Sequence, residues 1–108
     1  MDKEKDKALV KNAADKEQVK AAGSKEKRRR EKELSDIREL LRTPGGRRFM
    51  WRYLDRCGVY RSSFTGNSQT FFLEGERNIG LQMITDIMDA DPGLYIEMIK
   101  ENRSDKDA

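Results

Sequence analysis

Three arginines recur at one-turn spacing within a stretch that has the pattern of a helix: Arg48, Arg52 and Arg56. Residues four apart share one helix face. Guanidinium groups in such a row match a line of phosphates, and a neighbouring indole can stack on a base. The pattern predicts a nucleic-acid or partner-binding face made of Arg47, Arg48, Trp51, Arg52, Arg56 and Arg61. The alternative is a solvated face, or pairing of these arginines with Glu74, Glu76, Glu97 or Glu101.

A second basic cluster consists of Lys27, Arg28, Arg29 and Arg30. One hypothesis is that this cluster binds DNA or another anionic surface. Runs of this kind bind nucleic acid or other anionic surfaces. Glutamates at 26, 31 and 33 dilute the local positive charge, however. A solvated helix held by ion pairs between residues four apart explains the run equally well.

Catalytic chemistry has few candidates in this chain. Histidine is absent, which removes the commonest general base and the commonest metal ligand. Cys57 is the single cysteine, and no residue stands out as a base for the serines of segment 61–68. The carboxylates after position 73 do not follow a calcium-loop pattern, although they leave a divalent cation open as an alternative. We expect a non-enzyme without catalytic, cofactor-binding or metal-binding residues.

The chain divides by composition near residue 33. Residues 1–33 contain no aromatic side chain and carry 12 basic and 8 acidic groups, a net of +4. Residues 34–108 contain all eight aromatic residues and carry 11 basic and 12 acidic groups, a net of −1. We therefore expect a charged arm over 1–33, helical or disordered, a helical domain over 34–102, and a frayed tail over 103–108. A domain of about 70 residues is near the lower limit for a self-sufficient core, so self-association is a plausible supplement.

Apolar periodicity predicts four helices and no strand. The expected ranges are 24–42, 44–57, 68–89 and 93–101, with a further helix-prone stretch over 3–22 that Gly23 and Ser24 interrupt. Thr43 and Pro44 are expected to start the second helix, and Gly58 to end it in a left-handed conformation. Gly75 and Gly80 predict close approach of a neighbouring helix, and Phe64 is expected to fill the core.

The fold class expected from these ranges is all-α: a small domain of three to four helices preceded by a long charged helix or disordered arm. No apolar run approaches the roughly 20 residues that cross a bilayer, so no membrane segment is expected. The expected core consists of Leu34, Ile37, Leu41, Phe49, Leu54, Ile79, Met83 and Ile87, with Phe72 on the same face as Ile79.

Several motifs together resemble a known family. They are TPGGRRF at 43–49, CGVYRSSF at 57–64 and EGERNIGL at 74–81, followed by Pro92, Tyr95 and Met98. This set is similar to a family of small tailed-bacteriophage proteins named after an open reading frame of a Bordetella phage, over about residues 34–102. The resemblance implies a phage protein, often encoded among virion-assembly and packaging genes, and it supplies no catalytic residues. It also implies an ion-pair network joining positions 47 and 48 to 76 and 77.

Composition and resemblance together lead us to expect a non-enzymatic virion-associated or assembly and packaging protein. We expect it to act through contacts with phage structural proteins. Packaged DNA is a further candidate partner. The expected location of the protein is the virion or the infected host cytoplasm. Two alternatives stay open: an early phage protein that binds and inhibits a host enzyme, and a small nucleic-acid-binding protein.

Overall fold

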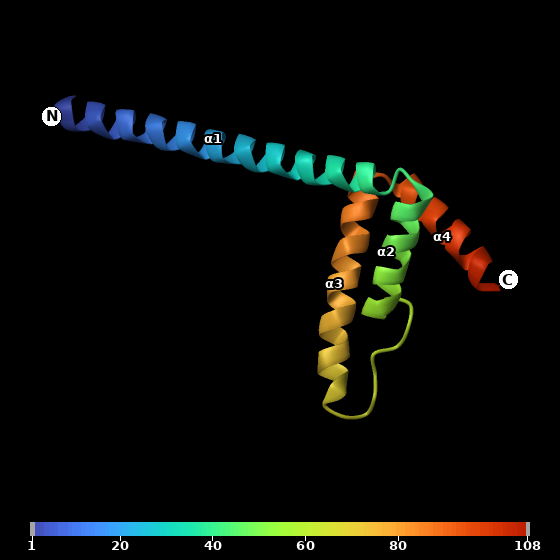
Figure 1. Cartoon of the computed structure of the whole chain (residues 1–108). Coiled ribbons are helices and arrows are strands. Elements are labelled where there is room, and N and C mark those ends of the chain that lie inside the picture. The colour runs from blue at the N-terminus through green and yellow to red at the C-terminus, as the bar shows by residue number, and fades with distance from the viewer. Residues whose placement is uncertain (1, 108) are drawn as a thin grey trace. The chain divides into compact units, whose positions relative to one another are not determined.

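The computed structural model describes the backbone of residues 2–107 and the side chains of residues 3, 6, 7 and 9–103. Four helices follow in order: α1 (Asp2–Leu40), α2 (Pro44–Cys57), α3 (Gln69–Ala90) and α4 (Pro92–Asp107) (Figure 1). Residues 2–107 contain no strand, so the all-α prediction is confirmed. The chain separates into two compact units, 1–33 and 34–108, and each is described by itself.

The first unit is the N-terminal part of α1. The interruption expected at Gly23 and Ser24 is wrong, because α1 continues through both residues. A glycine inside a helix costs only about 1 kcal/mol relative to alanine, and the surrounding lysine, glutamate and alanine residues are strong helix formers. Local ion pairs add support: Arg29 lies 2.9 Å from Glu26, and Arg30 lies 3.3 Å from Glu33.

In the second unit, α2 begins and ends at the expected residues. The Thr43 hydroxyl accepts a hydrogen bond from the Gly46 backbone N–H at 3.2 Å, and Pro44 occupies the first turn. Gly58 has φ 76°, and its N–H donates to the carbonyls of Leu54 and Asp55. A side chain is disfavoured in this left-handed conformation, so Gly58 is a steric requirement for the end of α2.

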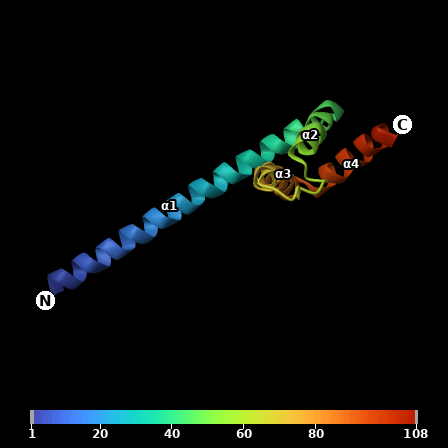
Figure 2. The same cartoon turned by 90° about the horizontal axis from the view of Figure 1, so that it is seen from below.

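The core of the second unit forms where α2, α3 and α4 contact one another (Figure 2). Its buried apolar side chains are Leu34, Leu41, Met50, Leu54, Val59, Ile87 and Met98. Ile37 and Met83 pack against this cluster while remaining partly exposed. Six of the eight expected core residues are therefore buried or packed where the sequence predicted.

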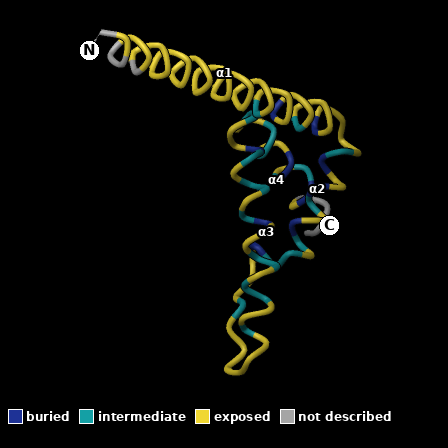
Figure 3. The backbone as a smooth tube through the Cα atoms, turned by 90° about the vertical axis from the view of Figure 1, so that its left-hand side faces the viewer, coloured by how far each residue is buried: buried dark blue, intermediate teal, exposed yellow. Residues whose placement is uncertain are grey.

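Four aromatic or apolar residues expected in or against the core are instead exposed: Phe49 by 54%, Ile79 by 54%, Phe72 by 69% and Phe64 by 78%. For Phe72 the reason is length: the 22 residues of α3 extend beyond the 14 of α2, so α2 does not cover the N-terminal turns of α3. Ile79 is exposed because it lies on a different side of α3 from Gly80, which contacts Val59 and Cys57 at the end of α2. Figure 3 shows exposed stretches at this end of α3 and in the adjoining loop, interrupted by shorter intermediate ones.

The ends of α3 and α4 differ slightly from expectation. Helix α3 begins at Gln69, whose N–H donates to Asn67 Oδ1 at 2.9 Å. Helix α4 begins at Pro92 and continues to Asp107, beyond the expected end at 101. The tail expected to fray, 103–108, falls mainly on residues whose side chains lie outside the described set.

The two glycines of α3 differ in what surrounds them. A Cβ added to Gly80 would lie 2.4 Å from Val59 Cγ1 and 2.8 Å from Cys57 Cβ, so the predicted close approach is confirmed there. A Cβ added to Gly75 would meet nothing within 4 Å, so the same prediction is wrong for Gly75 within this chain.

We expect Gly80→Ala to lower the free energy of unfolding by about 1–3 kcal/mol, because the added methyl overpacks the contact between α2 and α3. Urea denaturation measures the loss. Gly45→Ala is the matched control, since its Cβ would meet only Arg48 Nη2 at an ordinary 3.8 Å. Equal stability of the two variants would contradict the close contact at Gly80.

Candidate functional site

Arg47, expected on the partner-binding face, is instead a buried structural residue with 6% exposure. Its guanidinium donates to both Glu101 carboxylate oxygens, at 2.7 and 2.9 Å. Nη1 also donates to the backbone carbonyls of Leu41 at 2.9 Å and Arg42 at 3.1 Å. One side chain of α2 therefore joins the α1–α2 turn to α4, and Arg47 is unavailable to a partner.

The charges of this pair stabilise one another. The hydrogen bond from Arg47 holds the pKa of the Glu101 carboxyl below its ordinary value, and the hydrogen bond from Glu101 raises the pKa of Arg47. Glu97 lies 3.7 Å from the same guanidinium. Pairing of the arginines with Glu97 or Glu101 was one of the alternatives that the sequence left open.

The ion-pair network that the resemblance implied with Glu76 and Arg77 is absent. No ion pair within 4 Å joins these two residues to Arg47 or Arg48 among the described side chains.

Trp51 also has a structural role. It packs against the core, and its ring stacks on Tyr60 with centroids 5.3 Å apart and planes inclined by 28°. The Tyr60 hydroxyl in turn lies 2.8 Å from that of Tyr95, and partial burial raises the pKa of Tyr60. Because Tyr60 covers one face of the indole, Trp51 is poorly placed to stack on a base.

The exposed surface of α2 combines cations with aromatic rings. We call it the α2 ridge, and it consists of Arg48, Phe49, Arg52, Tyr53 and Arg56, all of them exposed. Phe49, Arg52, Tyr53 and Arg56 line a shallow groove of about 170 Å³. Among the described side chains, no hydrogen bond and no ion pair within 4 Å engages the three guanidinium groups, although the charge of Arg48 also helps to lower the pKa of the Glu101 carboxyl. Of the residues predicted for the binding face, Arg48, Arg52 and Arg56 therefore belong to the α2 ridge.

Phe49 and Tyr53 are the ridge residues that were not predicted for the binding face, and Phe49 was expected in the core instead. The apolar residues of α2 form two rows. Met50, Leu54 and Cys57 recur at helical spacing and face the core, while Phe49 and Tyr53 form a second row. Together the two rows form an arc wider than a stripe of about 100°, and that width was the available signal that one row could stay exposed.

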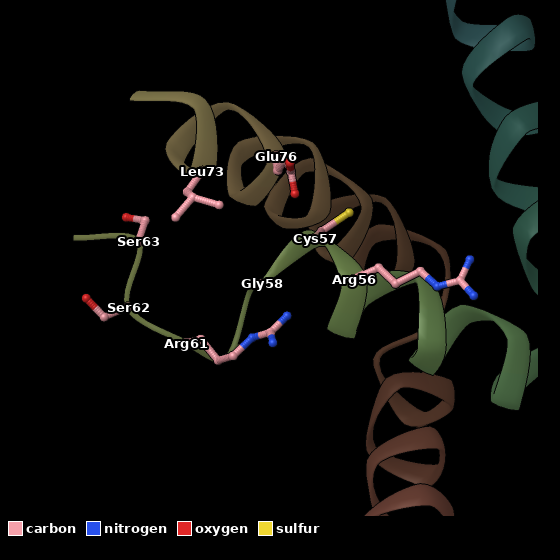
Figure 4. A pocket seen from close by; sticks show the side chains of 8 residues that line it. All are labelled: Arg56, Cys57, Gly58, Arg61, Ser62, Ser63, Leu73 and Glu76. Carbon is pink, nitrogen blue, oxygen red and sulfur yellow. The ribbon is translucent and has the colours of Figure 1, made fainter. Parts of the chain in front are cut away.

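A small cavity lies beside the C-terminal end of α2, with a volume of about 240 Å³. Its lining comprises Arg56, Cys57, Gly58, Arg61, Ser62, Ser63, Leu73 and Glu76. Figure 4 shows Glu76 entering from α3 and the two serines lying on the loop, where Ser62 Oγ accepts from the Phe64 N–H at 3.2 Å. Arg61 donates to the Asp55 carbonyl, so one of its amino groups is already engaged. The lining can hold a small polar or anionic group.

The basic cluster at 27–30 lies on α1, within the first unit. Lys27, Arg28 and Arg29 are exposed, and Arg29 is paired with Glu26, as Arg30 is with Glu33. Both interpretations of this cluster, anionic-surface binding and ion-paired solvation, are compatible with that arrangement.

Neither a metal-binding cluster nor a membrane-spanning helix is present among the described residues. No group of three or more cysteine, aspartate or glutamate side chains in the described part of the chain is arranged to hold a metal ion. No helix there is both long and apolar enough to cross a membrane.

Comparison with protein families identifies the second unit. The model of the family described as Bbp19-like phage protein matches residues 37–100. The chain belongs to this family. The Bbp19-like segment spans α2 and α3 and includes Arg47 and the whole α2 ridge. It ends one residue before Glu101 and leaves out the basic cluster. No curated protein and no solved structure matches the chain.

Removing the Arg47 side chain should destabilise the domain without altering the ridge. We expect Arg47→Ala to lower the free energy of unfolding by about 1–3 kcal/mol, because the carbonyls of Leu41 and Arg42 lose their buried donor. Arg48→Ala removes the adjacent, exposed arginine and should change stability by no more than about 0.5 kcal/mol. Thermal and urea denaturation of both variants measure the difference, and similar losses would contradict the anchoring role of Arg47.

The ion pair of Arg47 and Glu101 should also make the free energy of unfolding depend on pH in the acidic range. Because the folded pKa of Glu101 is depressed, its contribution is fully present above the unfolded value near 4.5 and is lost as pH falls through the lower folded value. Glu101→Gln should therefore be less stable at neutral pH and lose less stability on acidification below about pH 4.5. Urea denaturation across this range tests it. Glu39→Gln, which breaks the exposed pair with Arg42, should keep the wild-type pH profile.

Proposed function

We propose that this phage protein is a non-enzymatic virion-associated or assembly protein that acts through protein–protein contacts. The α2 ridge carries the proposal, because it displays three exposed guanidinium groups and two exposed aromatic rings on a folded helix. Arginine and aromatic side chains are enriched in protein interfaces, where aromatic rings supply apolar contact area. The partner that this chemistry fits is an acidic protein surface with apolar pockets, as on another phage structural protein.

Membership of a phage protein family supports a role in the phage life cycle. The lack of histidine supports a non-enzymatic role. The cavity beside Cys57 is lined by arginine, serine and a single carboxylate, a set better suited to holding a partner's polar group than to acid–base catalysis. The proposed location is the virion or the infected host cytoplasm.

Packaged DNA is a second candidate partner, favoured by the spacing of Arg48, Arg52 and Arg56 along one face. Phosphate contacts of this type give an affinity that falls steeply with salt concentration. Loss of that salt-dependent binding in the double variant Arg48→Ala/Arg52→Ala would support DNA contact, and unchanged binding would exclude the ridge as its source.

Mass spectrometry of purified particles and assembly intermediates tests the proposed role, and we expect the protein in one or both. In phage carrying Arg52→Ala we expect fewer incorporated copies, because the central cation of the ridge is missing. Arg103→Ala removes an exposed cation of α4 that is outside the ridge and should leave incorporation unchanged. Absence of the wild-type protein from all particles, with stoichiometric capture of one host enzyme, would instead support the inhibitor alternative.

A further inference from the structure

The charged residues of α3 between Gln69 and Met88, namely Glu74, Glu76, Arg77 and Asp86, are only partly exposed. Every exposed residue from Gln69 through Met88 is uncharged, in a chain in which 40% of residues are charged. We call the central part of this surface the uncharged face of α3, and it consists of Phe71, Phe72, Gly75, Asn78, Ile79 and Gln82. These residues recur at three- and four-residue intervals, so they share one side of the helix.

The uncharged face leaves a large apolar area in solvent. Phe71 is 82% exposed, Phe72 69% and Ile79 54%. With a phenylalanine able to bury about 200 Å², the six residues of the face offer roughly 500 Å² per molecule. Two such faces together would bury about 1,000 Å², the lower limit for a specific interface.

Gly75 lies at the centre of this face, one turn after Phe71 and one turn before Ile79. A glycine there costs the helix about 1 kcal/mol relative to alanine. No described residue of the second unit requires it, because an added Cβ would meet no atom within 4 Å. Gly80, by contrast, is required by its contact with Val59 and Cys57. Together with the exposed phenylalanines, Gly75 fits the close approach of a helix from another molecule.

We propose that this helix is α3 of a second copy, and that two chains pair antiparallel through their uncharged faces and cross at Gly75. A two-fold axis at this position sets Phe71 of each copy against Ile79 of the other. The six residues of the face favour a second copy, because they are uncharged and identical faces meet without like charges among them; Glu74 and Glu76, which flank Gly75, are partly exposed and project about 100° to either side of it, at the edges of the contact. The absence of charge on the face also disfavours nucleic acid, since no exposed cation of this face could contact phosphate. The pairing does not depend on the proposed virion role.

Sedimentation equilibrium of the full chain tests the proposal, and we expect a reversible dimer. Gly75→Ala should weaken dimerisation by about tenfold, because two methyl groups separate the helices at their crossing, while the monomer unfolds at a higher temperature. Gly23→Ala is the matched control, since Gly23 is also a helical glycine with nothing within 4 Å, and it should leave dimerisation unchanged.

A charge-swap experiment tests the antiparallel register. Phe71→Lys and Ile79→Glu should each abolish the dimer. Mixing the two variants should restore association, because the introduced ammonium group of one chain then faces the introduced carboxylate of the other. Ile96→Lys places a charge at the 52% exposed Ile96 of α4 and should have no effect on association. Circular dichroism verifies that each variant is folded.

Three outcomes would overturn the proposal. A wild-type chain that stays monomeric at every soluble concentration excludes the pairing. A dimer that survives both charge variants uses another surface. Capture of the uncharged face by a different phage protein, with no self-association, assigns the face to that protein.

Discussion

The hydrogen bonds of Arg47 are the constraint on which the second unit depends. Its guanidinium is almost fully removed from water, yet it donates to a carboxylate and to two backbone carbonyls. A buried charge is tolerated only when such partners are present. The α1–α2 turn, α2 and α4 are therefore held in a defined arrangement, and no buried polar side-chain atom of the described residues lacks a partner.

With α2 and α4 held by this arginine, the small core can be closed by few side chains. Seven apolar residues are buried, and the remaining large apolar residues lie outside or only partly covered. A domain of this size cannot enclose all of its aromatic side chains. The excess is displayed on two surfaces of different character: a cationic ridge on α2 and an uncharged face on α3. Surfaces of this kind are typical of proteins that bind other proteins.

The two surfaces suit different partners because their charges differ. The α2 ridge offers guanidinium groups between aromatic rings, which an acidic partner can neutralise. The uncharged face of α3 offers no charge to match, so its affinity would come from apolar burial and close helix packing. A protein that self-associates through one face would present the other in two symmetric copies, and multivalent contact of this kind strengthens binding within a large assembly.

The boundaries of α2 and the all-α class were determined locally, and so could be predicted from the sequence. Thr43, Pro44 and Gly58 specify where α2 begins and ends through interactions with their near neighbours. The arginine row could likewise be predicted, because one-turn spacing needs no tertiary information. The tertiary structure alone decided that Arg47 is buried, that Trp51 stacks on Tyr60, and that Phe49, Phe64, Phe72 and Ile79 face solvent. Which side of a helix is covered depends on the length and position of its neighbours, and those are set by contacts between residues far apart in the chain, such as Arg47 with Glu101.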